Sequence, residues 1–83
     1  MELKDTIALM TSDDYRKRFK AEYFQLKIRY EKLCAMLDKW QAKTLPFTPT
    51  CPYGLLLEQS LYMEQLLNVL GRRARLEGID LEE

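Results

Sequence analysis

The sequence contains no histidine, which is both the commonest general base and the commonest metal ligand in proteins. Its two serines, Ser12 and Ser60, therefore have no imidazole to activate them. The three glycines, at positions 54, 71 and 78, are too far apart to form a phosphate-cradling loop. These absences argue against an enzyme, and we expect no catalytic residue and no cofactor.

Cysteine, net charge and long apolar runs are scarce as well. Cys34 and Cys51 are too few for a disulfide scaffold, and without a CxxC pair or histidine they make a poor metal site. No run of about 18 apolar residues exists, and the N-terminal MELKDTIALM is too acidic for a secretion signal. We therefore expect a cytoplasmic protein with reduced thiols that does not enter a membrane. A formal net charge of zero argues against general nucleic-acid binding.

The composition is that of a folded, helix-rich chain with one domain, because 47% of the 83 residues are apolar and 31% are charged. A first helix is expected over residues 12–43, with Thr11 or Ser12 as its N-cap. It ends before Pro46, because a residue that precedes proline avoids helical angles. Its apolar residues follow a strict heptad pattern, which indicates packing along a partner helix: Phe19, Tyr23, Leu26, Tyr30, Leu33, Leu37 and Trp40.

A second helix is expected over residues 52–77, with Pro52 in its first turn and Gly78 as its C-terminal stop. The loop 44–51 lies between the helices. Together with Pro52 it forms the stretch TLPFTPTCP, which holds all three prolines. Apolar residues cover nearly three quarters of the second helix, so it should be buried on several sides. Residues 1–11 form either a short helix or an extension, the hairpin spans 12–79, and 80–83 form a tail.

One hairpin cannot cover that much apolar surface, and chains of this size are marginally stable alone. The first helix also carries a second apolar strip at Phe24, Ile28 and Ala35. The expected fold class is therefore all-α: a long two-helix antiparallel hairpin that assembles into an oligomeric helical bundle. We therefore expect the chain to bind further copies of itself and form a homo-oligomer.

Two clusters are candidate ligand-binding sites. In a hairpin, Arg72 and Arg73 near the end of the second helix approach Tyr15 and Lys20 near the start of the first. Arginine suits phosphate because of its bidentate fork, and an aromatic ring can stack on a base. The simpler interpretation is that cations near a helix C-terminus are solvated and favoured by the helix dipole.

The second cluster lies at the loop end, where Lys39, Thr48 and Thr50 offer an ammonium group and two hydroxyls. TLPFTPTCP is then either a plain connector, half of a metal site, or the rim of a ligand pocket. The aromatic residues of the heptad row, including Tyr23, Tyr30 and Trp40, are by default core residues.

Several segments resemble a family of small helical-hairpin proteins from tailed phages of gut bacteria. The similar segments are RYEKL at 29–33, FTPTCP at 47–52, the LL and EQ pairs at 56–59, YM at 62–63 and VLGRRARLEGI at 69–79. The architecture also resembles the phage sponges that sequester nucleotide signals of the CBASS and Thoeris defence systems. This similarity implies a non-catalytic counter-defence protein that binds a cyclic oligonucleotide or cyclic ADP-ribose signal. The alternative is a helical interaction module that binds and inhibits a host protein.

Overall fold

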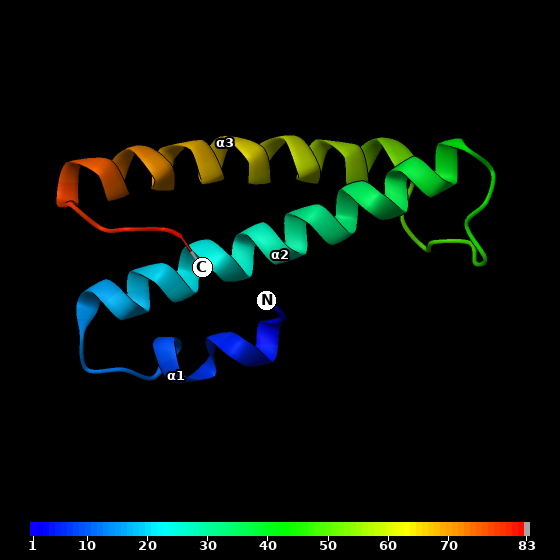
Figure 1. Ribbon diagram of the computed structural model, residues 1–83. Coiled ribbons are helices and arrows are strands. Elements are labelled where there is room, and N and C mark those ends of the chain that lie inside the picture. The colour runs from blue at the N-terminus through cyan, green and yellow to red at the C-terminus, as the bar shows by residue number, and fades with distance from the viewer. Residues whose placement is uncertain (83) are drawn as a thin grey trace.

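The computed structural model describes residues 1–82 as a helical hairpin with a short N-terminal segment folded against it (Figure 1). A 3-10 turn η1 (Leu3–Thr6) runs into the short helix α1 (Ile7–Met10). The two long helices are α2 (Tyr15–Gln41) and α3 (Tyr53–Glu77). The described residues contain no strand, so the all-α class and the helical hairpin are confirmed.

The N-cap of α2 is Asp14, three residues later than the Thr11 expected from sequence and two later than Ser12. The Asp14 carboxylate accepts a hydrogen bond of 2.9 Å from the backbone N–H of Arg16. The Ser12 hydroxyl instead accepts from the backbone N–H of Asp14 at 3.0 Å and thereby orders the approach to the helix. Asp and Ser cap helices about equally well, so the pattern Thr-Ser-Asp-Asp did not identify the capping residue.

The connection between α2 and α3 spans residues 42–52, and its second residue, Lys43, is left-handed, at φ 61°. The backbone N–H of Thr44 donates a hydrogen bond of 2.9 Å to the carbonyl oxygen of Lys39 and closes the last turn of α2. Pro52 is the N-cap of α3, in extended backbone geometry. The proline-rich stretch therefore ends one helix and starts the next, as a connector does.

The main core lies where the start of α2 meets the end of α3. Phe19 from α2 packs there with Leu70 and Ala74 from α3, and each of the three is at most 3% exposed. Gly78 has φ 69°, the left-handed geometry of a helix C-terminal stop, and it turns the chain so that Ile79 closes the same core. The expected stop at Gly78 is confirmed, and the heptad row of α2 does face α3.

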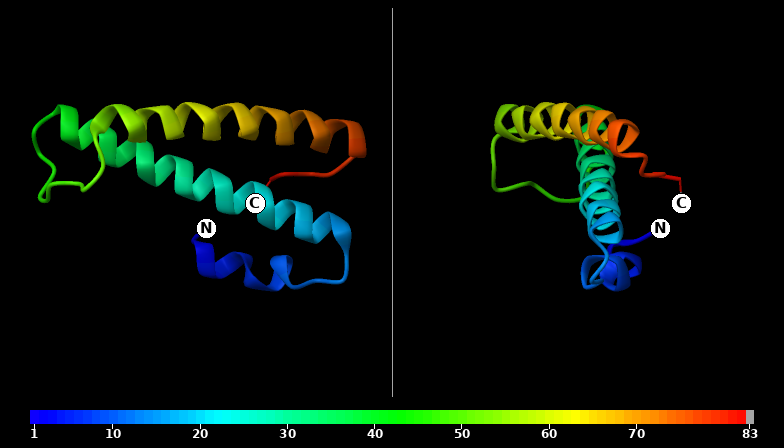
Figure 2. Two further views of the ribbon diagram at one scale, coloured as in Figure 1. Left: turned by 180° about the vertical axis from the view of Figure 1, so that it is seen from behind. Right: turned by 90° about the vertical axis from the view of Figure 1, so that its left-hand side faces the viewer.

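The N-terminal segment covers the opposite side of α2, so the molecule has three layers (Figure 2). Thr6 is 1% exposed, and its hydroxyl accepts a hydrogen bond of 2.9 Å from the side-chain amide of Gln25. Ala21 and Phe24, on that same face of α2, are 2% and 3% exposed. Phe24 was expected to be part of an oligomer surface, but it is already buried within the chain.

Candidate functional site

The open end of the hairpin joins an aromatic ring, a guanidinium and a carboxylate across its two helices. The Tyr15 hydroxyl at the start of α2 donates to Glu77 Oε1 at 2.8 Å. Arg73 Nη2 donates to the same Tyr15 oxygen at 2.9 Å, and Arg73 Nε lies 3.4 Å from Glu77 Oε2. Two residues that the sequence predicted to meet, Tyr15 and Arg73, are therefore in direct contact, and one donor from each holds the Glu77 carboxylate.

This arrangement shifts the protonation equilibria of its members. The hydrogen bond to Glu77, followed by partial burial and the negative charge of Glu77, raises the pKa of Tyr15. Partial burial lowers the pKa of Arg73, but Tyr15 and Glu77 together more than offset that effect, so its pKa is raised. At neutral pH the site thus presents a protonated phenol and a permanently charged guanidinium.

Neighbouring side chains fix the position of Arg73 and of the helix end. The Arg73 guanidinium carbon lies 4.9 Å from the centre of the Phe19 ring, which is a cation–π contact. Arg16 Nη2 donates to the Glu77 carbonyl oxygen at 3.0 Å, and Arg16 Nη1 reaches the Gly78 carbonyl at 3.4 Å. Arg16 therefore satisfies carbonyls that the end of α3 leaves without a helical partner.

Lys20 and Arg72, the other two candidates at this end, do not join the network. Lys20 is half-buried beside Phe19, and Arg72 is exposed. Consecutive residues of a helix point about 100° apart, so Arg72 and Arg73 face different sides of α3. Glu77 and Arg16 were not among the site residues predicted from sequence, although the spacing of four residues from Arg73 to Glu77 is typical of an ion pair on a helix.

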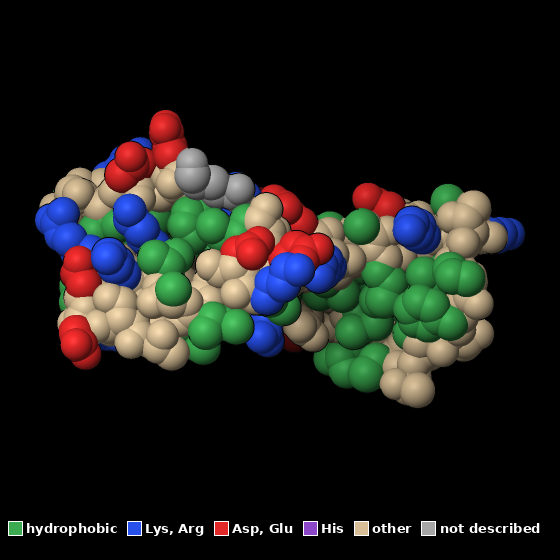
Figure 3. All heavy atoms as spheres, turned by 60° about the horizontal axis from the view of Figure 1, so that its bottom comes forward, with side chains coloured by type: hydrophobic (Ala, Val, Ile, Leu, Met, Phe, Trp, Pro, Cys, Tyr) green, Lys and Arg blue, Asp and Glu red, His purple; other side chains and the backbone are tan. Residues whose placement is uncertain are grey.

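The loop end contains a shallow hollow of about 350 Å³ that brings two candidates together. Thr48 and Thr50 line it with the Phe47 ring, the Cys51 thiol and apolar side chains of both helices. Lys39 is not among the lining residues, and its backbone carbonyl is taken by Thr44. Hydrophobic side chains gather over this end of the molecule (Figure 3), so the hollow offers contact to an apolar or aromatic group more than to an anion.

The aromatic residues of the heptad row behave as core residues. The Trp40 ring meets Tyr53 edge to face, with 5.3 Å between ring centres, and locks the loop end of the hairpin. Tyr23 packs against the main core. The Tyr30 hydroxyl interacts with Cys34 one turn later, and this hydrogen bond is the main reason why the pKa of Tyr30 is raised.

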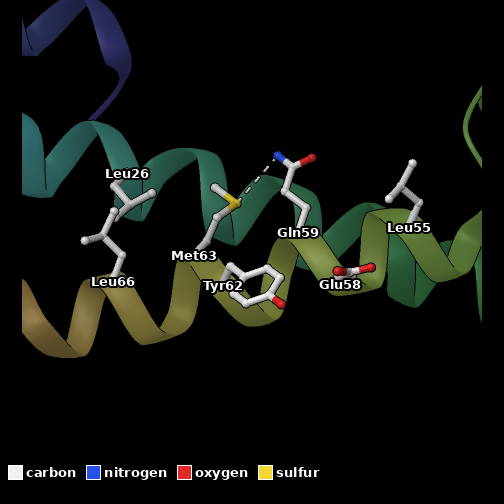
Figure 4. A pocket seen from close by; sticks show the side chains of 7 residues that line it. All are labelled: Leu26, Leu55, Glu58, Gln59, Tyr62, Met63 and Leu66. Atoms are coloured by element: carbon white, nitrogen blue, oxygen red, sulfur yellow. Dashed lines mark hydrogen bonds between the residues drawn. The ribbon is translucent and has the colours of Figure 1, made fainter.

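A larger groove of about 530 Å³ runs along α3 beside α2 (Figure 4). Leu26 of α2 forms one wall, and the other lining residues all belong to one face of α3: Leu55, Glu58, Gln59, Tyr62, Met63 and Leu66. Several of these side chains are strongly exposed, including Tyr62 at 63%. The sequence predicted an excess of apolar surface on this helix, and the structure locates part of it here.

A family model described as Sequestin matches residues 13–76, from the capping turn of α2 to the last turn of α3. No curated protein and no solved structure matches the chain. Among residues 1–82, none of the helices is long and apolar enough to span a bilayer.

Proposed function

The chain belongs to the Sequestin family, and from this premise we propose that it sequesters a phosphate-bearing nucleotide signal by non-catalytic binding. The family name suggests sequestration of a ligand, which supports a binding role. The signal class we propose is a cyclic oligonucleotide or a cyclic ADP-ribose isomer. The setting is a phage counter-defence protein that acts in the host cytoplasm as a homo-oligomer.

The observation that carries this proposal is the Glu77 carboxylate between Tyr15 and Arg73. A phenol O–H and a guanidinium N–H already hold an anionic oxygen group there, at 2.8 Å and 3.4 Å. A phosphate presents the same acceptor oxygens with at least equal charge, so it can replace the carboxylate on the same donors. The Tyr15 ring is 47% exposed and offers a face on which a base can stack.

The remaining candidates have separate supporting roles. Lys20 and Arg72 flank this end of the hairpin and add positive charge that attracts an anion over a distance. Thr48 and Thr50 at the loop hollow offer hydroxyls to the other end of a ligand that spans two copies, with Lys39 nearby. Their participation depends on how copies pack, because the two clusters lie at opposite ends of one hairpin.

Native mass spectrometry tests the proposal directly. The purified protein is measured alone and with a panel of cyclic di- and trinucleotides and cyclic ADP-ribose isomers. We expect a discrete oligomer that gains the mass of an intact ligand and releases it unchanged on denaturation. An oligomer that binds no nucleotide would overturn the proposal and favour the alternative, a protein partner, which retention of a host protein on immobilised chain would then identify.

Three variants locate the site once a ligand is found, and titration calorimetry measures their affinity. Arg73→Ala should weaken binding at least tenfold, because a charged hydrogen bond to phosphate is lost. Glu77→Gln should tighten binding by about two- to fivefold, since the competing negative charge is removed. Lys32→Ala, an exposed cation in the middle of α2, is the matched control and should bind as the parent does. Equal affinity in Arg73→Ala would rule out this site.

A further inference from the structure

The exposed side of α3 carries a row of seven residues whose spacing is nearly symmetric about its central residue, Gln65. Its members, here called the outer row, follow steps of three and four: Leu55, Glu58, Tyr62, Gln65, Val69, Arg72 and Leu76. All seven are exposed. A step pattern of three and four is the seam of a helix that packs lengthwise against another helix, yet within residues 1–82 nothing covers this one.

From this row we infer that two copies of the chain pair through α3 in antiparallel orientation, with Gln65 on the two-fold axis. This inference deepens the homo-oligomer of the proposed function by assigning its surface and its orientation. A two-fold axis makes each residue of the row meet its counterpart counted from the other end. Leu55 then faces Leu76 of the partner subunit, and Tyr62 faces Val69 of the partner subunit.

The charges decide the orientation. In the antiparallel pairing, Glu58 faces Arg72 of the partner subunit on both sides of the axis. A parallel pairing would instead place Glu58 against Glu58 and Arg72 against Arg72, which is repulsive twice over. Within residues 1–82, neither Glu58 nor Arg72 forms an ion pair or side-chain hydrogen bond, so both are free for this role. The two Gln65 amides meet on the axis, where each can donate to the other.

The exposed surface area of the chain also supports the pairing of two copies. The chain exposes 6059 Å², whereas a compact monomer of 9.9 kDa exposes about 5,200 Å². The excess of roughly 850 Å² is about what one subunit contributes to a standard protein interface. The 530 Å³ groove beside Leu55 and Tyr62 gives the partner helix a seat between α3 and α2 (Figure 4).

A charge swap tests the pairing, with sedimentation velocity over a range of protein concentrations as the measurement. Glu58→Arg and Arg72→Glu should each weaken the dimer by about tenfold or more, because each creates two like-charge contacts. The double variant should restore the parent affinity. Glu64→Arg and Arg75→Glu, on the same helix but outside the outer row, are the controls and should sediment as the parent does.

Disulfide trapping gives a second, independent readout. In a background with Cys51→Ser, equal amounts of Glu58→Cys and Arg72→Cys chains are mixed under mild oxidation. Antiparallel pairing predicts a mixed 58–72 disulfide in preference to either self-linked dimer.

Three results would overturn the inference: a monomeric parent chain, a double variant as weak as the single ones, or preferential self-linking of the cysteine chains. The first would also remove the oligomer from the proposed function. The other two leave the oligomer and the ligand site at Tyr15 and Arg73 intact. Circular dichroism of each variant confirms that a lost dimer reflects the interface, not an unfolded chain.

Discussion

At the scale of single residues, the glycines of α3 differ in what they do. Gly71 lies inside the helix, and a Cβ added there would have no neighbour within 4 Å. Gly78 has φ 69° and ends the helix in a conformation that other residues adopt only with strain. The first position tolerates a side chain and the second requires glycine.

We predict opposite effects for alanine at these two positions. Gly71→Ala should raise the free energy of unfolding by about 0.5–1 kcal/mol, because alanine restricts the unfolded chain and favours helix. Gly78→Ala should lower it by about 1 kcal/mol, since alanine resists the left-handed geometry. Urea unfolding followed by circular dichroism measures both. A destabilised Gly71→Ala chain would mean that another copy packs closely at this position.

The tyrosine that holds Glu77 gives a second prediction at this scale, read from its titration. The raised pKa of Tyr15 means that the folded state keeps its phenol proton at a pH where the unfolded chain has lost it. The stability contributed by this group is therefore fully present below about pH 10 and is lost as pH rises through the folded pKa.

Glu77→Ala should return the Tyr15 pKa toward its ordinary value, because the hydrogen bond and the neighbouring negative charge both disappear. Absorbance of tyrosinate at 295 nm against pH measures the change. We expect Tyr15 to titrate at lower pH in the variant than in the parent chain, while Tyr30 keeps its raised pKa in both. An unchanged titration curve would show that the Tyr15–Glu77 hydrogen bond does not persist in solution.

At the scale of elements, the start of α2 depends on one capping side chain. Asp14→Ala should lower the free energy of unfolding by about 1 kcal/mol, because the Arg16 N–H loses its acceptor. Asp13→Ala, one residue earlier and exposed, should change it by less than about 0.5 kcal/mol. Equal effects of the two substitutions would show that helix-dipole attraction, not the cap, stabilises this end.

The elements themselves could largely be predicted from sequence, whereas their contacts could not. Heptad spacing and the positions of Pro46, Pro52 and Gly78 indicate two helices and the turn between them, because these features act locally. The packing of residues 1–11 against Ala21 and Phe24 does not follow from sequence, since the short pattern of residues 1–11 fits either a free extension or a helix. Burial of Phe24 depends on a fold-back that no local pattern specifies.

The candidate site, too, could be predicted from sequence only in part. Antiparallel topology alone brings Tyr15 and Arg73 to one end of the hairpin, so this pair could be predicted from sequence. Which of two adjacent arginines turns toward Tyr15 depends on the exact rotation of α3, and the sequence did not distinguish Arg72 from Arg73. The nearly symmetric spacing of the outer row about Gln65 becomes meaningful only once the structure shows which face of α3 is exposed.

At the scale of the whole molecule, exposed area and stability are linked. The main core is small and lies at one end of the hairpin, so the proposed pairing through α3 would add stability to the chain. A second copy that binds the folded state and not the unfolded state makes the unfolding temperature depend on protein concentration. We predict that the thermal midpoint of the parent chain rises by several degrees between about 5 and 500 μM, since a hundredfold change corresponds to about 2.7 kcal/mol per mole of dimer.

Tyr62→Glu should abolish this dependence, because it places a like charge beside Glu58 in the centre of the proposed interface. Its midpoint should match that of the parent chain at the lowest concentration, since Tyr62 is 63% exposed and contributes little to the folded monomer. Glu64→Arg, at an exposed residue of α3 outside the outer row, should keep the dependence of the parent. Differential scanning calorimetry at five or more concentrations decides the matter. A parent midpoint that does not move with concentration would mean that the excess surface of α3 stays in water.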